Sequence, residues 1–292
     1  MNFQAETVSF CDLTCSECPN WMMKRKRHLM SPEIWDTILR KYVVPYHRLN
    51  EHLGPPTLIP HKDGEPLLNK NLPSFLKSAS DLLPELRINI YSHGLLLKHS
   101  FLDFLWSLPN KVTLLISFHF HNHDGTYNDY KKTTDLLQTV FSGRKVTDQN
   151  VEFVLTSHLI APMTSARLLE WKEMWRPWID EGKVTVHANV SINPWTGLMK
   201  DVATCQHHGC PYSEFGHMFF GATGNVIACC MDLEEEIVFG NVLKDDPEEM
   251  VAKVREFYAA QKHGKPLYSV CNDCYGLPRE EKQGLLQLGG VA

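Results

Sequence analysis

The chain has 292 residues, of which 43% are hydrophobic, and a formal net charge of -5. A chain of this size can bury one large core, or one core with a smaller appended domain. It shows no apolar run long enough for a membrane span, no secretion signal and no overall basic character, which predicts a cytoplasmic protein and argues against nucleic acid as its partner.

Strand-like apolar runs alternate with amphipathic helical stretches over the first two-thirds of the chain. This is the pattern of stacked βα units around a parallel sheet. We expect strands at 7–10, 57–60, 87–91, 112–120, 151–156 and 183–190. We expect helices at 32–42, 72–82, 98–106, 130–141 and 165–175. Six strands are too few for a closed eight-fold barrel, so the fold class is α/β with an open, partial (β/α)6 barrel. Its active site should lie at the C-terminal ends of the strands.

Three cysteines follow the first expected strand with the spacing C-x3-C-x2-C: Cys11, Cys15 and Cys18. Thiols this close can face one point, and thiolates are the ligands of iron-sulfur clusters. A four-iron cluster held by three cysteines keeps one iron open to a small molecule. The alternatives are a zinc site, with His28 as a possible fourth ligand, or a disulfide with a spare thiol.

Six more cysteines occur in the last third of the chain: Cys205, Cys210, Cys229, Cys230, Cys271 and Cys274. Nine cysteines without a secretion signal favour metal binding over disulfides. Residues 218–220 and 226–228 predict a β-hairpin. A hairpin cysteine and a distant C-x2-C pair can enclose a second metal group. The turn at 193–197 marks the expected boundary between a barrel, residues 1–197, and a small α+β domain, residues 198–292.

The three-cysteine motif after a short strand resembles the radical S-adenosylmethionine (radical SAM) superfamily. The loop 61–66, His-Lys-Asp-Gly-Glu-Pro, resembles the G-G-E-P motif of that family, with Asp63 in place of the first glycine. The resemblance implies that the three cysteines hold a 4Fe-4S cluster, that its open iron binds SAM, and that Glu65 holds the SAM ammonium group. Glu17 stands where many members carry an aromatic residue beside the adenine.

Polar residues also follow the third and fourth expected strands. Ser92 and His93 stand where many radical SAM proteins read T-N-G, and Ser117 matches a position that often contacts the SAM carboxylate, so the resemblance implies cofactor binding for all three. His119, His121 and His123 come next at i, i+2 and i+4. They could share one strand face as a metal site, or equally point into a polar cavity. Imidazole titrates near neutral pH, so we expect substrate binding or proton transfer here, with His119 and His121 as catalytic candidates.

The C-terminal cysteines resemble those of SPASM/twitch auxiliary domains. The resemblance implies one auxiliary 4Fe-4S cluster on Cys210, Cys229, Cys271 and Cys274, and a zinc site on the same thiols is the alternative. Cys205 could replace Cys210 as a ligand, or donate a hydrogen atom to a substrate radical. Cys230, next to a ligand on a strand, should point to the opposite face and be buried and inert.

The resemblance implies a radical SAM oxidoreductase that abstracts a hydrogen atom from its substrate. We expect a two-electron oxidation of a small hydroxylated or amino-sugar-like molecule, with the auxiliary cluster as electron acceptor and a flavodoxin- or ferredoxin-type reductant. The position of Cys11 leaves little room for a fused leader-binding domain, which favours a small substrate. The alternatives are a peptide-modifying (RiPP-type) SPASM enzyme, a radical epimerase that uses Cys205, and a non-catalytic iron-sulfur module, against which the intact cysteine motif and Glu65 argue.

Overall fold

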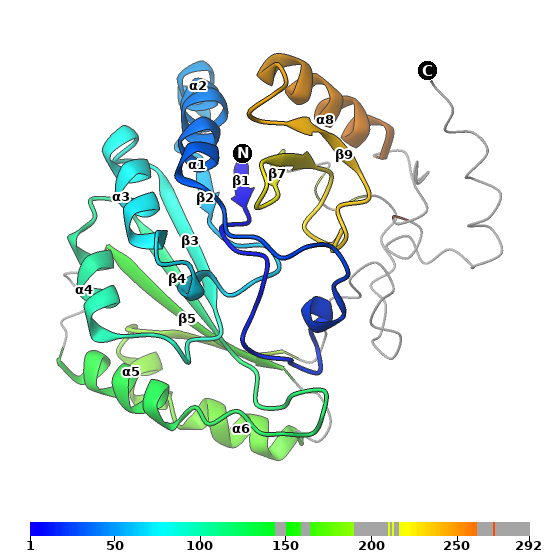
Figure 1. Ribbon diagram of the computed structural model, residues 1–292. Coiled ribbons are helices and arrows are strands. Elements are labelled where there is room, and N and C mark those ends of the chain that lie inside the picture. The colour runs from blue at the N-terminus through cyan, green and yellow to red at the C-terminus, as the bar shows by residue number, and fades with distance from the viewer. Residues whose placement is uncertain are drawn as a thin grey trace.

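The computed structural model describes residues 1–143, 150–158, 164–189, 210, 212, 216–261 and 271. The centre of this part of the chain is a nine-stranded sheet with the order β6-β5-β4-β3-β2-β1-β7-β8-β9 (Figure 1). The strands are β1 (Asn2–Ala5), β2 (Thr57–Ile59), β3 (Arg87–Ser92), β4 (Val112–Phe118), β5 (Val151–His158), β6 (Thr185–Asn189), β7 (His217–Phe220), β8 (Asn225–Ile227) and β9 (Val238–Asn241).

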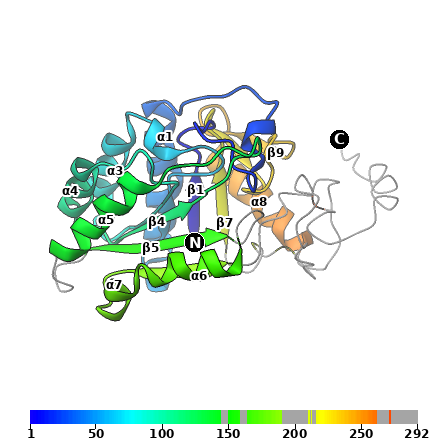
Figure 2. The same cartoon turned by 90° about the horizontal axis from the view of Figure 1, so that it is seen from below.

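The α-helices are α1 (Pro32–Ile38), α2 (Val44–Leu49), α3 (Leu72–Leu82), α4 (His99–Ser107), α5 (Lys131–Gly143), α6 (Ser165–Glu173), α7 (Arg176–Asp180) and α8 (Pro247–Gln261). A π-helical turn, η2 (Leu39–Val43), joins α1 to α2. Three short 3-10 helices complete the described elements: η1 (Pro19–Met22), η3 (Glu51–Leu53) and η4 (Pro66–Leu68). Helix α8 lies at the β7–β9 end of the sheet, away from α4 and α5 (Figures 1 and 2).

Strands β1 to β6 pair in parallel, and β7 also pairs in parallel with β1, at Asn2 with His217. Strands β8 and β9 continue the sheet antiparallel. In β4, alternate side chains from Val112 to Phe118 are fully buried, and the residues between them are only half-buried. The period of two gives the sheet one face for the helices and another for the site, since Ser117 is on the half-buried face.

Two asparagines close successive βα units. The side-chain amide of Asn110, just before β4, donates to the carbonyl oxygens of Leu83 and Leu86 after α3, at 3.0 and 2.9 Å. The amide of Asn150, just before β5, donates to Leu105 and Leu108 at the end of α4, at 3.1 and 2.8 Å. Each amide therefore adds hydrogen bonds to carbonyl groups at the end of a helix, where the helix itself supplies few donors.

The open, mostly parallel α/β fold is the one expected. Strand β9 and helices α7 and α8 were not predicted, and two further elements differ from the expectation. The first strand was expected at 7–10, and it is β1, residues 2–5. The side chains of Phe3 and Ala5 are buried in the core, whereas the Thr7 hydroxyl donates a hydrogen bond to the Pro60 carbonyl at 2.8 Å. Segment 7–10 therefore leaves the sheet. Helix α2 was not expected. The expected helix ended at residue 42, whereas α1 continues without a break through the π-helical turn η2 into α2, which contains Pro45 in its first turn.

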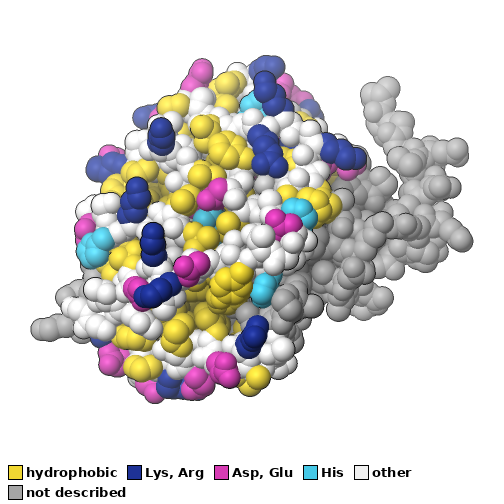
Figure 3. Space-filling view, turned by 60° about the horizontal axis from the view of Figure 1, so that its bottom comes forward, with side chains coloured by type: hydrophobic (Ala, Val, Ile, Leu, Met, Phe, Trp, Pro, Cys, Tyr) yellow, Lys and Arg dark blue, Asp and Glu magenta, His cyan; other side chains and the backbone are white. Residues whose placement is uncertain are grey.

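The surface shows no concentration of one charge on the face seen in Figure 3, where Lys and Arg side chains are interspersed with Asp and Glu. None of the helices in the described part of the chain has the length and apolar composition of a membrane span.

Candidate active site

A cavity of about 220 Å³ lies at the C-terminal ends of the first four strands. It brings together eight of the residues proposed from the sequence: Cys11, Cys15, Cys18, Glu65, Ser92, His93, Ser117 and His119. Six further residues line it: Glu17, His61, Lys62, Asp63, Gly64 and Tyr91. Residues from four separate βα units thus meet at one point, as expected for this edge of a parallel sheet.

The three-cysteine loop is anchored to the segment after β4. The Ser16 amide donates to the His121 carbonyl at 3.1 Å, and the Thr14 amide donates to the Asn122 side chain at 3.2 Å. Cys15 is buried, and Cys11 and Cys18 are half-buried. These bonds hold the thiols on a fixed backbone beside the cavity.

The donor set fits an iron-sulfur cluster. All three thiols are free of disulfides and line one cavity. Burial raises the pKa of Cys18 to about 12 and raises that of Cys15 as well, so without a positive partner these thiols stay protonated. A metal centre supplies the positive charge that turns such thiols into thiolate ligands.

Glu65 is fixed before any ligand arrives. One carboxylate oxygen accepts hydrogen bonds from the Leu67 amide at 3.0 Å and the Ser92 hydroxyl at 2.8 Å, and the other accepts from the His93 amide at 2.9 Å. The side chain is almost fully buried. Because each oxygen has two lone pairs, the oxygen bonded to His93 can still accept from a cation such as an ammonium group.

Gly64 and Asp63 explain how the loop after β2 differs from G-G-E-P. A Cβ on Gly64 would lie 2.3 Å from the Val8 carbonyl oxygen and 2.6 Å from that of Phe10, so the close approach of two backbones requires glycine. Asp63, in contrast, has room for its carboxylate, which pairs with Arg25 at 2.9 Å and with Lys62. The substitution of the first glycine is therefore accommodated by two cations.

His93 is held by Asp12 at 2.9 Å between Nε2 and Oδ1, and its Nδ1 accepts a hydrogen bond from the Leu95 amide. The Nε2 atom therefore carries the proton that Asp12 accepts, and this hydrogen bond lowers the pKa of Asp12. The donor atoms of Cys11, Asp12 and His93 lie within 4.8 Å of one another. The sequence singled out His93 but not Asp12.

Glu17 and His119 form a hydrogen-bonded pair that sequence reasoning missed. Burial acts to raise the pKa of Glu17, but the hydrogen bond and charge of His119, together with hydrogen bonds from the backbone and from Ser16, lower that pKa. The backbone of His119 is fixed because its amide donates to the Tyr130 hydroxyl at 3.0 Å and its carbonyl accepts from Asn128 at 2.6 Å. The only sequence signal was a carboxylate at a position where the family usually has an aromatic ring.

The other two histidines do not join His119. Strand β4 ends at Phe118, so the alternation that would have aligned the three rings on one face stops before them. His121 packs edge-on against Tyr127, and His123 stacks on Trp21 at 4.0 Å between ring centroids. Neither lines the cavity, and a catalytic role for His121 stays a prediction.

Two more cavity residues carry charge or polarity that the sequence did not reveal. His61 Nδ1 lies 2.9 Å from the Gly64 carbonyl oxygen, and burial lowers the pKa of this imidazole to about 4. Lys62 is almost fully buried, and its ammonium group pairs with Asp63 and donates to the Asp232 carbonyl at 2.8 Å. Lys62 thus extends from the cavity to the turn before β9.

The C-terminal cysteines that the structure describes lie around Tyr258. Burial, followed by the nearby thiols of Cys229, Cys210, Cys230 and Cys271, raises the pKa of Tyr258 well above its usual value. Cys205 and Cys274 lie outside the described residues. This arrangement agrees with a common site for Cys210, Cys229 and Cys271, whose ligand roles stay predictions.

Cys230 is buried, as expected, but it does not point away from its neighbour. Its thiol is hydrogen bonded with Cys229, and it lies 2.9 Å from the Tyr212 hydroxyl. The strict alternation of a strand does not apply, because β8 ends at Ile227 and both cysteines lie in the turn that follows.

Residues 210–275 match the SPASM family, described as an iron-sulfur cluster-binding domain. This match confirms the predicted iron-sulfur domain. No curated protein sequence matches the chain.

BtrN and anSMEcpe are two of the solved structures that share the fold. One is BtrN in complex with AdoMet and 2-DOIA, at 20% identity and a TM-score of 0.62, covering 90% of this chain and 87% of BtrN. Another is native anSMEcpe with bound AdoMet, at 16% identity and a TM-score of 0.58, covering 88% of this chain and 82% of that one. The expected fold class is confirmed.

Proposed function

We propose that this chain, a radical SAM protein with a C-terminal SPASM domain, is an oxidoreductase that cleaves S-adenosylmethionine reductively and abstracts a hydrogen atom from its substrate. The substrate we propose is a small hydroxylated or amino-sugar-like molecule that loses two electrons and becomes a ketone. The C-terminal iron-sulfur site is proposed as the electron acceptor. The cysteine layout resembles that of 2-deoxy-scyllo-inosamine dehydrogenase, and BtrN was solved with AdoMet and 2-DOIA.

The observation that carries the proposal is the convergence of the three free thiols, Glu65 and the Glu17–His119 pair on one cavity. Thiols and a carboxylate offer separate contacts for a metal cluster and for an ammonium group. AdoMet is bound in both BtrN and anSMEcpe, which supports the same cofactor here.

Cys11, Cys15 and Cys18 would hold the cluster, and Glu65 would bind the SAM ammonium group. When bound, a 4Fe-4S cluster with an open iron coordinates SAM and supplies the electron that cleaves it. Ser92 keeps Glu65 in place through its hydrogen bond, and the amide of His93 does the same from the other side. With these bonds already made, the carboxylate loses little freedom when the cofactor binds.

His119 is the residue we propose for removing the hydroxyl proton of the substrate. It lines the cavity, and the Glu17 carboxylate beside it stabilises the imidazolium that forms. Tyr130 holds the backbone amide of His119 and Asn128 holds its carbonyl, so the imidazole is oriented before the substrate binds. A histidine held by a carboxylate partner is a common general base.

A peptide substrate is the second candidate, because anSMEcpe was also solved with AdoMet and a Cp18Cys peptide. That structure has 14% identity and a TM-score of 0.58, and the match covers 98% of this chain and 96% of anSMEcpe. An epimerase that returns a hydrogen atom from Cys205 remains distinguishable by experiment, since it would leave solvent deuterium on an inverted carbon.

The test begins with protein reconstituted anaerobically. About eight irons per chain, falling to about four when Cys11, Cys15 and Cys18 are all changed to Ala, are expected for two 4Fe-4S clusters. Wild-type protein should form 5'-deoxyadenosine from SAM under strong reductant, and polyols or amino sugars should yield an oxidised product.

Formation of 5'-deoxyadenosine with no oxidised product from any of these substrates would refute the oxidation. A His119→Gln variant should still cleave SAM but make much less product. Equal product from that variant would remove His119 from the mechanism.

A further inference from the structure

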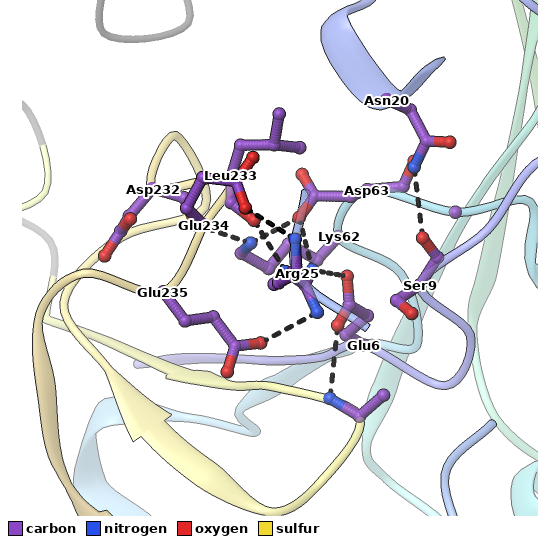
Figure 4. Close-up of polar contacts among 12 residues, drawn as sticks. Glu6, Ser9, Asn20, Arg25, Lys62, Asp63, Asp232, Leu233, Glu234 and Glu235 are labelled. Carbon is purple, nitrogen blue, oxygen red and sulfur yellow. Dashed lines mark hydrogen bonds and ion pairs between the residues drawn. The ribbon is translucent and has the colours of Figure 1, made fainter. Parts of the chain in front are cut away.

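One guanidinium joins the segment after the three-cysteine loop to the turn that follows Cys229. Arg25 donates to Glu6 at 2.6 Å and to Asp63 at 2.9 Å, and it pairs with Glu235 at 3.1 Å (Figure 4). Its Nε donates to the Leu233 carbonyl at 2.6 Å. The four acceptors belong to the end of β1, the loop after β2 and the β8–β9 turn, so Arg25 ties three separate parts of the chain together.

Two further contacts bind the same turn. The Glu234 carboxylate accepts hydrogen bonds from the backbone amides of Lys24 and Arg25, at 2.9 and 2.8 Å. Lys62 donates to the Asp232 carbonyl at 2.8 Å (Figure 4). Every residue of the turn from 232 to 235 is therefore bonded to a segment that flanks either the three-cysteine loop or Glu65.

The charges in this network are buried. The side chains of Glu6 and Asp63 are fully buried, that of Lys62 is 1% exposed, that of Glu235 8% and that of Arg25 12%. Ions removed from water are costly, and an apolar contact of the same size usually stabilises at least as much. What the ion pairs add over an apolar contact is direction, because a planar guanidinium bonds its partners only in a fixed geometry.

The turn is also strained where it meets Arg25. Glu235 has a φ of 56°, the only positive φ at a non-glycine residue among those described. The left-handed region costs about 1 kcal/mol for such a residue. Its carboxylate is fixed on both sides, because the Asn225 amide donates to it at 2.9 Å and Gly221 leaves it space that a Cβ would occupy at 2.3 Å. Strain retained in this way is common where a structure must hold one geometry.

We propose that Arg25 is a positioning residue. With Lys62 and Glu235, it fixes the turn after Cys229 against the Cys11–Cys18 loop and so sets the separation of the two iron-sulfur sites. The inference rests on the proposed function in that each site must hold a cluster. Asp63, the residue that departs from G-G-E-P, has a role in this network, because it is the acceptor that Arg25 and Lys62 share.

The test compares Arg25→Met, Arg25→Lys and Glu235→Gly with wild-type holoprotein. Circular dichroism and iron content identify the variants that fold and hold both clusters. Pulsed electron paramagnetic resonance of the fully reduced protein then measures the magnetic interaction between the clusters, which depends on their separation. Arg40→Met is the matched control, since it removes an exposed arginine whose partner, Asp36, is in the same helical segment.

We expect Arg25→Met and Glu235→Gly to lose or broaden the inter-cluster interaction at full iron content, and Arg25→Lys to retain part of it. Glu235→Gly is the more stringent variant, because glycine relieves the φ strain and should fold even where Arg25→Met does not. Arg40→Met should match the wild type.

A merely structural role for Arg25 would lower the unfolding temperature and leave the interaction of the folded protein unchanged, and that result would overturn the proposal. A wild-type protein with four irons would overturn it too. Failure of the proposed function would give a different result. The wild-type protein would then show the magnetic interaction between its clusters but form no 5'-deoxyadenosine from SAM.

Discussion

Gly64 lies where two stretches of backbone come too close for any side chain. An added Cβ would meet the backbone oxygen atoms of Val8 and Phe10, which cannot move aside as a flexible side chain would. We expect Gly64→Ala to lower the free energy of unfolding by about 1–3 kcal/mol, the usual cost of overpacking. Because Glu65 is the next residue, SAM affinity should fall as well. Urea unfolding and equilibrium dialysis with SAM measure the two effects.

The matched control is Gly143→Ala at the end of α5. A Cβ there meets no atom within 4 Å, so the variant should be neutral or more stable by about 0.4–1 kcal/mol. Equal stability of Gly64→Ala and wild type would show that the loop can shift.

His217 makes the folded protein sensitive to acid. Burial lowers its pKa from 6.5 to about 4, so the folded state holds the neutral imidazole and the unfolded chain takes up a proton first. The contribution to stability is complete above pH 6.5 and is lost as the pH falls towards 4, by up to about 3 kcal/mol. His217→Phe should flatten this part of the curve, because a phenyl ring can pack on Tyr212 and Phe219 as the imidazole does.

Urea unfolding at several pH values between 4 and 7 measures the slope. The control is His99→Phe, which changes an exposed histidine. An unchanged slope in His217→Phe would assign the acid sensitivity to other groups.

At the scale of elements, Asn110 closes the α3–β4 unit. Its amide is fully buried and donates to two carbonyl groups that have left the helix. Asn110→Ala should lower the free energy of unfolding by about 1–3 kcal/mol, because the Leu86 carbonyl loses its side-chain donor. The Leu83 carbonyl still accepts from the Leu86 amide at 3.1 Å. Asn110→Asp keeps the shape but loses both N–H donors, so it should be at least as unstable at pH 7. If Asn110→Asp unfolds with nearly the same free energy as the wild type, packing and not hydrogen bonding stabilises the contact between α3 and β4.

Periodicity predicted most elements of the barrel, because each strand or helix is set by its own short window of apolar residues. It failed for β1. Residues 7–10 alternate between polar and apolar side chains as a strand does, but the hydroxyl groups of Thr7 and Ser9 donate hydrogen bonds to neighbouring segments outside the sheet. The cysteine motif and Glu65 were found because their spacing is local. The Glu17–His119 pair and the link from Arg25 to the β8–β9 turn were not. Glu17 and His119 are 102 residues apart and Arg25 and Glu234 are 209 residues apart, so only the fold brings them together.

At the scale of the whole molecule, one sheet runs through both predicted domains. Strand β1 has β2 on one side and β7 on the other, and Phe219 and Phe220 of β7 are fully buried. Phe220 also packs edge-on against Tyr42 of η2, at 5.2 Å between centroids. The C-terminal strands therefore belong to the same core as the barrel.

We accordingly expect the full chain to unfold in a single transition, with fluorescence and circular dichroism giving the same midpoint in urea. A fragment of residues 1–197 would expose the free edge of β1 and the apolar surface that β7 covers, and it should aggregate or lack native circular dichroism. Phe219→Ala in the full chain should lower the free energy of unfolding by about 3–5 kcal/mol while keeping one transition. Two separate transitions, or a soluble and folded 1–197 fragment, would instead mean that the barrel is stable by itself, and that the contacts of β1 with β7 serve only to align the two parts.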